Sequence, residues 1–530
     1  MEFSSPDSRL TAARRRTEFT ELRESPKTWD LVVIGAGVTG AGTALDAASR
    51  GMSVLLVEAH DLAFGTSRWS SKLAHGGLRY LSTGHAGVAL RSAAERGILM
   101  ERTAPHLTRA LSQVVPLLDS LSFAQRTLPG LGFLAGDLLR RASGTSSATL
   151  PRPRYLRPAE VQRLCPTVET KGLRGGLLNV DGQLVDDARL VTALARTAAG
   201  YGATVLTYAR ASAATGESVE LRDELNPGAA PVSVAARAVV NATGVWAGEL
   251  QSDIRVRPSR GTHVVVRSEK LGDPEGALTV PVPGSVSRYC FILPQELGRC
   301  FIGLTDVDQP GKVPDVPDAP EEDVQWVLDV VNQGLGTKLT MDDVAGAYAG
   351  LRPLISMEGD DEDTSDLSRD HAILTSDNGL ITVTGGKLTE YRLMAEETVD
   401  TAIERIGGGP GRFRECETKN LPLVGAPGNP AFGKVSGADL IGYPESMVRR
   451  FGRETPAVVR SATCDRPLEQ VAEGIDITRA EFEFAIRNEG VATVADLLDR
   501  RFRLGLIEDD RAAAEPAANE LLILAGVEPK

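Results

Sequence analysis

Two short apolar runs near the N-terminus, at residues 31–34 and 54–57, are rich in β-branched side chains. Short runs of this kind, bounded by turn residues, are typical of strands that are buried in a parallel sheet. Residues 43–50 between them have a helical pattern, which Gly51 ends. The opening stretch is therefore predicted to fold as a strand, a helix and a second strand.

Later apolar segments return to this domain and then add others. Within residues 236–247, an apolar strand is predicted that ends in Ala-Thr-Gly, at the sheet edge where cofactors bind. Alternating or apolar runs at 260–267, 289–294 and 300–304 are separated by turns, which predicts an antiparallel sheet facing a substrate. From Gly425 onward the chain is largely helical and charged.

These patterns predict an α/β fold with a Rossmann-like, discontinuous nucleotide-binding domain at 29–424. An antiparallel substrate domain is expected to be inserted at about 255–370, and a helical domain to occupy 425–530. Residues 1–28 are expected to be a mostly disordered lead-in.

Glycines follow the first strand at once. Gly35, Gly37 and Gly40 have the G-x-G-x-x-G spacing, which suits a tight turn, a close approach to a pyrophosphate and close packing of helix on strand. Glu58 ends the second strand, 18 residues after Gly40, where an acid accepts ribose hydroxyls and repels a 2′-phosphate. The pattern favours dinucleotide binding, with NADP disfavoured. The alternative is a glycine-rich turn in an ordinary α/β domain.

The loop from Asp61 to Tyr80 is dense in hydroxyls and glycine and then becomes basic and aromatic. Such a loop can surround a cofactor with backbone and hydroxyl donors. The alternative is a polar surface loop, but Gly76, Gly77 and Leu78 make that alternative weaker.

Composition narrows the classes of function. The 530 residues carry a net charge of −13, which argues against nucleic acid as a partner but not against a local basic pocket. The five cysteines form no C-x-x-C pair, so neither a zinc site nor a redox dithiol is predicted, and no metal is expected. Their scatter fits a reducing cytosol.

A membrane-spanning segment is not predicted. No stretch reaches the roughly 20 apolar residues that span a bilayer, and the polar N-terminus is not a secretory signal. Residues 117–139 are apolar but interrupted by glycines and by Asp119, Gln125 and Arg126, so a covered or peripheral element is expected there. We expect a cytoplasmic protein.

Several separated motifs occur in one order along the chain. They are the glycine motif with Glu58, Ser71-Lys-Leu-Ala-His-Gly-Gly-Leu-Arg-Tyr-Leu81, Val185-Asp-Asp-Ala-Arg-Leu190, Asn241-Ala-Thr-Gly-Val-Trp246, Arg260-Gly-Thr-His263, Gly303-Leu-Thr-Asp306, Gly350-Leu-Arg-Pro353 and Gly385-Gly-Lys-Leu-Thr389. Over roughly residues 28–510 the chain resembles the FAD-dependent glycerol-3-phosphate dehydrogenases of the aerobic type. It departs from them in an N-terminal extension and in the bulk of Phe64, Arg68 and Trp69.

The resemblance implies FAD, oxidation of sn-glycerol 3-phosphate to dihydroxyacetone phosphate, and a quinone acceptor at the membrane. It implies peripheral association with the inner face of the plasma membrane. The oligomeric state stays open, with a homodimer as one option. Two alternative functions remain: an oxygen-using FAD oxidase of amines or hydroxy acids on the same fold, and a flavin- or NAD-binding module without turnover.

A phosphate dianion needs fixed cations, and arginine forks suit it best. Arg352, Arg369 and Arg79 are the candidates, each with a solvated surface charge as the alternative. Lys387 follows a Gly-Gly turn and is a candidate for the flavin, a substrate oxygen or the reaction itself. The alternative, a lysine at a helix N-terminus, is electrostatically unfavourable.

Loss of the hydroxyl proton needs a base. His263 is the first candidate and His75 the second, with a buried structural histidine as the alternative for either. Tyr80 is expected to pack on flavin or substrate, or else in the core. The predicted cofactor-binding residues are Gly35, Gly37, Gly40, Glu58, Thr66, Ser67, Ser71, Lys72, Leu73, His75, Gly76, Gly77, Thr243, Gly244, Trp246, Gly386, Lys387, Leu388 and Thr389.

Overall fold

Strand β1 (Thr28–Ile34) lies at the centre of the first of two large sheets. In this computed structural model it pairs in parallel with β2 and β10 on its two sides, and β7 and β18 continue the parallel order. Antiparallel β17 forms one edge, and β8 and β9 extend β10. The structure describes residues 7–77, 86–252, 254–285, 288–355, 371–407, 409, 411–432 and 434–528. The bounds are β2 Val54–Val57, β7 Thr204–Leu206, β8 Ala209–Ala214, β9 Ser218–Asp223, β10 Val232–Asn241, β17 His371–Thr375 and β18 Ile381–Gly385.

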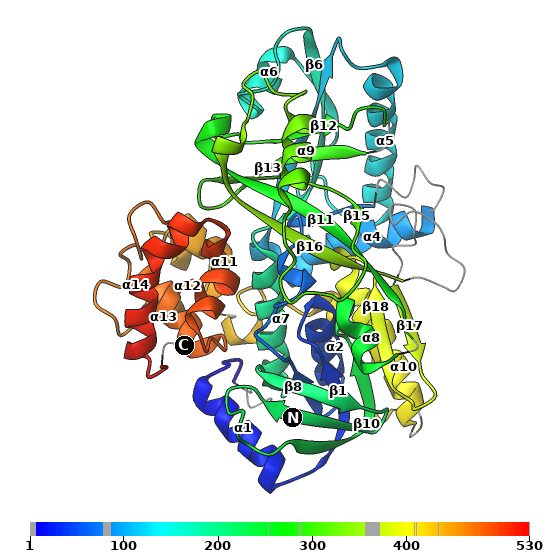
Figure 1. Ribbon diagram of the computed structural model, residues 1–530, viewed down its shortest axis with the longest axis vertical. Coiled ribbons are helices and arrows are strands. Elements are labelled where there is room, and N and C mark those ends of the chain that lie inside the picture. Colours follow the sequence, from blue (N-terminus) through cyan, green and yellow to red (C-terminus); the bar gives the residue numbers. More distant parts are fainter. Residues whose placement is uncertain are drawn as a thin grey trace.

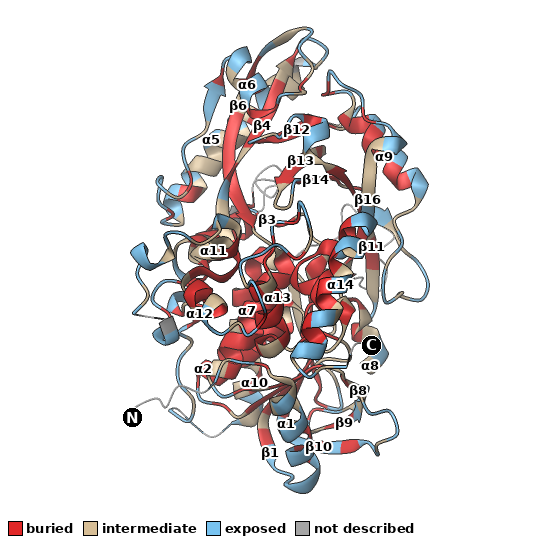
Figure 2. Cartoon of the chain, turned by 90° about the vertical axis from the view of Figure 1, so that its left-hand side faces the viewer, coloured by how far each residue is buried: buried red, intermediate tan, exposed pale blue. Residues whose placement is uncertain are grey.

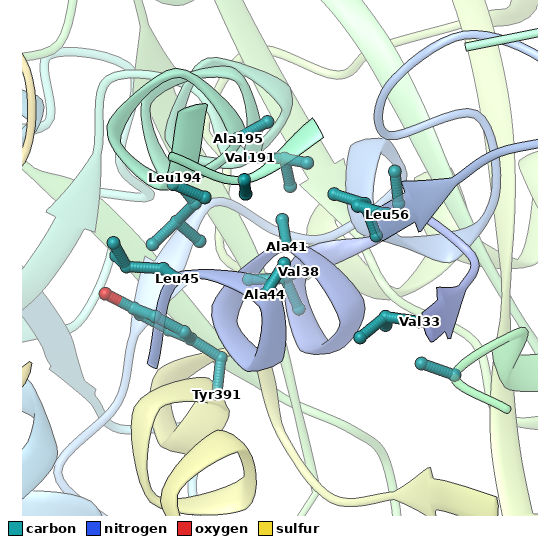
Figure 3. Packing of buried hydrophobic residues seen from close by; sticks show 14 of the residues in the cluster. Val33, Val38, Ala41, Ala44, Leu45, Leu56, Val191, Leu194, Ala195 and Tyr391 are labelled. Carbon is teal, nitrogen blue, oxygen red and sulfur yellow. The ribbon is translucent and has the colours of Figure 1, made fainter. Parts of the chain in front are cut away.

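Three helices cover one face of this sheet: α2 (Val38–Ser49), α7 (Asp187–Gly200) and α10 (Tyr391–Ile406). Alternate strand residues point to them, because side chains along a strand alternate between the two faces. Ala41 and Ala44 of α2 are small, so Val191 and Leu194 of α7 approach closely, and the Tyr391 ring lies beside them (Figure 3). Almost every residue of α7 is buried (Figure 2).

The second sheet is long and mostly antiparallel, and it lies above the first (Figure 1). Its strand order is β15-β11-β14-β13-β12-β4-β6-β3, with β16 paired to β11 and β5 to β6. The bounds are β3 Leu73–Ala74, β4 Thr108–Leu118, β5 Arg154–Leu156, β6 Leu173–Leu184, β11 Val256–Arg267, β12 Ala277–Pro281, β13 Tyr289–Gln295, β14 Arg299–Gly303, β15 Val307–Asp308 and β16 Val344–Ile355. Helices α6 (Pro158–Leu164) and α9 (Glu321–Val331) pack on it.

The predicted bounds of the substrate domain, about 255–370, are therefore too narrow. Strands β3 to β6 supply the other half of the sheet from residues 73–184. The pairing of β4 with β12 joins segments more than 150 residues apart, and periodicity within one strand carries no information about such a partner.

The C-terminal part of the chain forms a helical domain that packs against α7 and the ends of both sheets (Figure 1). Its helices are α11 (Glu445–Phe451), α12 (Thr455–Arg460), α13 (Arg479–Asn488) and α14 (Glu508–Leu524). Buried ion pairs hold it in place: Arg189 meets Glu489 at 2.5 Å, Arg196 meets Glu454 at 2.7 Å and Arg501 meets Asp61 at 2.7 Å. Breaking one such pair leaves a buried charge uncompensated, which costs about 3–5 kcal/mol.

The lead-in that was predicted to be mostly disordered contains helix α1 (Ala12–Glu24), and this prediction is wrong for the described residues 7–28. Thr11 caps the helix, and Phe19 and Leu22 are buried. The Arg15 guanidinium donates to the carbonyl of Thr207 at 2.8 Å. Phe19 and Leu22 pack this helix against the core, while the rest of its sequence is mainly charged and therefore resembles a solvated segment.

Residues 117–139 span the end of β4 and most of helix α5 (Phe123–Ala142). Leu128, Leu131, Leu134 and Leu138 on α5 are 46%, 64%, 61% and 65% exposed. Their spacing of three and four residues places them on one helix face. Across the described part of the chain, no helix combines the length and apolar character needed to cross a membrane.

Candidate active site

A cavity of about 1550 Å³ lies between the two sheets. One end is lined by the turn after β1, the end of β2 and the end of β10, and the other by β11, β16 and part of α5. The carboxyl ends of parallel strands are where α/β sheets bind cofactors. The volume exceeds that of an ordinary small-molecule site, so it accommodates a dinucleotide together with a small substrate.

Two glycines of the first turn, Gly35 and Gly37, line this cavity. Gly35 has a φ of +102°, and a Cβ there would lie 2.7 Å from the carbonyl oxygen of Ala242 on the next strand. A Cβ on Gly40 would overlap the carbonyl oxygen of Gly35, so this glycine brings α2 against β1 and does not itself line the cavity. Gly37 lines the cavity at the N-terminus of α2, where helix dipoles favour anions.

Glu58 lies beside these glycines at the end of β2 and lines the cavity. The N–H groups of Ala36 and His60 donate to its carboxylate at 2.7 and 3.0 Å, which fixes its position. Burial nevertheless raises the pKa of Glu58 above its ordinary value. A carboxylate held in this way suits the ribose-binding role that the motif predicted.

The hydroxyl-rich loop follows as the short turn η1 (Thr66–Arg68) and the residues after it. Thr66, Ser67 and Ser71 all line the cavity. The Ser67 hydroxyl accepts from the N–H of Val38 at 2.8 Å, and so ties the loop to the start of α2. The Ser71 hydroxyl lies 2.8 Å from Nε2 of His263.

Lys72 is not at the cavity, contrary to its predicted cofactor role. Its φ of +58° turns the buried side chain the other way, where Nζ lies 2.5 Å from Asp187 Oδ1 and donates to the carbonyl of Arg68 at 2.8 Å. Lys72 therefore anchors the loop from behind.

His75 lines the cavity with its side chain 49% exposed, and its Nδ1 lies 3.5 Å from Oδ2 of buried Asp181. The Arg96 guanidinium donates to the other oxygen of Asp181 at 2.6 Å. Burial alone raises the pKa of Asp181, but Arg96 and His75 outweigh burial and lower it to about 2. Gly76 does not line the cavity: a Cβ there would overlap the Arg96 guanidinium, so this glycine makes room for the ion pair.

His263 lines the cavity but is almost completely buried, at 2% exposure. Its ring stacks on Tyr348 with centroids 4.7 Å apart. Burial, and then the positive charges of Arg352 and Lys72, lower the pKa of His263 to about 3. The imidazole is therefore neutral at neutral pH and a weak proton acceptor. This property counts against His263 as the catalytic base.

Two of the predicted cations, Arg352 and Lys387, lie on the cavity wall, each beside a carboxylate. Arg352 of β16 lies 3.0 Å from Asp306 and donates to the carbonyl of Thr305 at 3.2 Å. Lys387 follows the Gly-Gly turn, and its Nζ lies 3.2 Å from Glu390 and donates to the Ser92 hydroxyl at 3.0 Å.

Sequence reasoning missed several of these partners. Asp306 ends one of the quoted motifs, and Glu390 directly follows another, three residues after Lys387, which was a readable signal. Asp181 and Ser92 come from β6 and from α4 (Ala86–Ile98), and no local pattern connects them to the site.

The remaining predicted residues divide into two groups. Those that line the cavity are Leu73, Gly77, Thr243, Gly244, Trp246, Gly386, Leu388 and Thr389. The Thr389 hydroxyl accepts from the N–H of His75 at 3.2 Å, so the Gly-Gly-Lys-Leu-Thr stretch and the His-Gly-Gly stretch meet there. Arg79, Tyr80 and Arg369 lie outside the described residues.

Comparison with known proteins agrees with this geometry. A family model described as FAD dependent oxidoreductase matches residues 30–392, and one described as the C-terminal domain of alpha-glycerophosphate oxidase matches 416–524. Glycerol-3-phosphate dehydrogenase 1 of Mycobacterium tuberculosis is 54% identical over 515 residues, which are 97% of this chain and 98% of that protein. The chain belongs to the FAD-dependent glycerol-3-phosphate dehydrogenase family.

More distant members of the family align over most of the chain too. The mitochondrial glycerol-3-phosphate dehydrogenase of Arabidopsis thaliana is 33% identical over 91% of this chain and 80% of its own length. The solved structure of glycerol-3-phosphate dehydrogenase from Bacillus halodurans complexed with FAD superimposes with a TM-score of 0.72 at 27% identity, covering 97% of this chain and 94% of that one.

The residues that line the cavity of this glycerol-3-phosphate dehydrogenase family member fit FAD. Gly35 and Gly37 leave room for a pyrophosphate at the N-terminus of α2, and Glu58 is placed for the ribose. Thr66 and Ser67 bring hydroxyls to the same wall. The chain is an FAD-dependent oxidoreductase.

Gly37→Val is expected to abolish FAD binding while the apoprotein still folds. A Cβ at Gly37 would approach only the Ser67 hydroxyl, at 3.1 Å, but the branched methyls would occupy the space that the pyrophosphate needs. Gly40→Ala should instead lower the melting temperature of the apoprotein, because its Cβ overlaps backbone. Flavin absorbance per protein and apoprotein melting curves distinguish the two, and full flavin content in Gly37→Val would contradict the assignment.

Proposed function

We propose that the chain oxidises sn-glycerol 3-phosphate to dihydroxyacetone phosphate and passes the electrons to a quinone. The observation that carries this proposal is the shape of the cavity, which joins the glycine-lined dinucleotide end to a wall bearing Arg352 and Lys387. FAD supplies the acceptor for the hydride that leaves the carbinol carbon. The protein holds the phosphate, orients the carbinol and accepts the hydroxyl proton.

Arg352 is proposed to bind the substrate phosphate. Its side chain is 23% exposed, and the ion pair with Asp306 together with the Ser259 hydroxyl, 3.1 Å away, orients the guanidinium towards the cavity. A guanidinium fork matches a phosphate with two parallel hydrogen bonds. Arg79 and Arg369 stay candidates from the sequence for the same role.

His75 is proposed to accept the hydroxyl proton. The carboxylate behind it, Asp181, favours one orientation of the ring and stabilises the imidazolium that forms. Arg96 helps to lower the pKa of Asp181 to about 2, so that carboxylate is ionised at neutral pH. His263 is proposed to support the ring of Tyr348 and the Ser71 hydroxyl rather than to exchange protons.

The exposed leucines of α5 support attachment to a membrane surface. An amphipathic helix lies in the interface with its apolar side among the lipid chains. Leu128, Leu131, Gly132 and Phe133 of the same helix also line the cavity. A membrane-bound α5 would therefore bring the flavin site next to the bilayer, where an apolar quinone is dissolved. This favours a quinone over oxygen as the acceptor.

Arg352→Ala should lower kcat/KM for glycerol 3-phosphate about ten- to a hundredfold, because a charge-assisted bond is worth roughly 1.5–3 kcal/mol. Glycerol, which has no phosphate, should lose little. Flavin content should stay normal. Steady-state rates with both substrates test this, and equal proportional losses would mean that Arg352 supports the fold or the flavin instead.

His75→Gln should lower kcat about a hundredfold or more, the usual range for a lost general base, with flavin content retained. His263→Gln should lower kcat much less, because the pKa of His263 is about 3 and its neutral ring is a weak proton acceptor. A large loss of kcat in His263→Gln with none in His75→Gln would reverse the assignment.

Replacing Leu131, Leu134 and Leu138 together by Gln should weaken binding to lipid vesicles about a hundredfold or more, since each buried leucine is worth roughly 1.5–3 kcal/mol. A matched control replaces Ile441, Ile523 and Leu524, which are 83%, 66% and 46% exposed and lie in the C-terminal domain. Co-sedimentation with vesicles measures both variants. Equal vesicle binding by both variants would exclude α5 as the attachment site.

A further inference from the structure

Arg503 belongs to the C-terminal domain, yet its side chain is inserted against the loop that lines the cofactor cavity. Its backbone is in the left-handed region, with φ +57° and ψ +26°. This conformation costs a residue with a Cβ roughly 1–2 kcal/mol of free energy. Such strain persists only where the surrounding structure imposes it. The side chain is buried, with 7% exposure.

The contacts of the Arg503 guanidinium join two domains. Nη1 donates to the carbonyl of Asp499 in its own domain at 2.7 Å, and Nη2 donates to the carbonyl of Arg68 in the loop at 2.7 Å. Nε lies 3.6 Å from Oδ2 of Asp186, which caps helix α7. The guanidinium also lies over the ring of Trp69, 4.7 Å from its centre.

The point of contact is the middle of the loop at residues 66–72. The carbonyl of Arg68 accepts from both Arg503 and the buried Lys72, so cations from two domains hold the same oxygen. Trp69 lines the cavity directly. Ser67 on one side is bonded to the start of α2, and Ser71 on the other is bonded to His263. A shift of the Arg68 carbonyl would therefore disturb the neighbouring residues Ser67 and Trp69, which line the cavity.

Three arginines meet at this interface between the loop and the C-terminal domain. Arg68, Arg500 and Arg503 lie close together, and burial followed by the charges of Arg503 and Arg500 lowers the pKa of Arg68 to about 9. Arg500 has the carboxylate of Asp61 at 2.7 Å, whereas Arg503 is oriented mainly by the two carbonyls.

We infer that Arg503 is a positioning residue for the cofactor: it clamps residues 66–72 from the C-terminal domain, so that this domain forms part of the FAD site. The inference depends on FAD binding and not on the identity of the substrate or the base. It predicts that FAD is released faster when the clamp is removed, even though the C-terminal domain stays attached through its other buried ion pairs.

The test uses the holoenzyme of Arg503→Met, which keeps the length of the side chain but not its donors or charge. On dilution, free-flavin fluorescence should appear about ten- to a hundredfold faster than in wild type. Limited trypsin treatment of the holoenzyme should now cut after Arg68 or Lys72, because these sites, 3% and 1% exposed in the intact protein, become accessible only when the loop opens.

Arg189→Met is the matched control. Arg189 is equally buried and also joins the two domains, through Glu489, but no hydrogen bond or ion pair in the described structure connects it to residues 66–72. Glu489 keeps Arg196 as a partner in this variant. The control should release flavin at the wild-type rate and resist trypsin at Arg68 and Lys72. If it behaves like Arg503→Met, domain docking in general explains the effect, and the clamp is refuted.

Arg503→Lys covers the case in which Arg503→Met does not fold. Lysine keeps the buried charge near Asp186, but its single ammonium cannot span the two carbonyls and has no planar face to lie on Trp69. Flavin release should be faster than in wild type and slower than in any folded Arg503→Met. Wild-type release and trypsin resistance in Arg503→Lys would overturn the proposal.

Discussion

The contact between the start of helix α2 and the end of strand β1 is the constraint on which the site depends. A Cβ at Gly40 would overlap the carbonyl of Gly35, and a Cβ at Gly35 would press on the carbonyl of Ala242. Three chain segments therefore meet with only backbone between them. This contact places the N-terminus of α2 beside Glu58, and a larger residue would separate the anion-binding helix from the acid that binds the ribose.

Buried charge connects that site to the rest of the molecule. Asp61 follows β2 closely and is held by Arg500 and Arg501 of the C-terminal domain. Such pairs add little stability compared with an apolar contact, but losing one partner is costly. Their geometry is specific, so the helical domain can dock in one orientation. That orientation is what brings Arg503 to the carbonyl of Arg68 in the loop at residues 66–72.

Local patterns predicted the nucleotide end of the site well, because its geometry arises within one strand, helix and strand. Long-range geometry explains the errors. Lys72 has the composition of a cofactor residue, but its left-handed backbone turns it towards Asp187. The absence of a side chain at Gly76 leaves room for Arg96, which lies on helix α4. His263 was the preferred base from its motif, yet burial, which is a tertiary property, makes it a poor one. Likewise, the strand pairs that complete the second sheet cannot be predicted from the sequence of either strand alone.

We propose that the pairing of Arg352 and Lys387 with carboxylates lets an acidic protein select a phosphate ester. Arg352 and Lys387 would repel each other and attract any anion if they were bare. Asp306 and Glu390 hold them in fixed positions before a ligand arrives, and reduce the net charge of the wall. A ligand gains from this wall only if it hydrogen-bonds to cations that are already oriented, which rewards shape as well as charge. On this proposal, specificity for a phosphate with a neighbouring carbinol follows from cations that are preorganised, and an overall positive charge is not required.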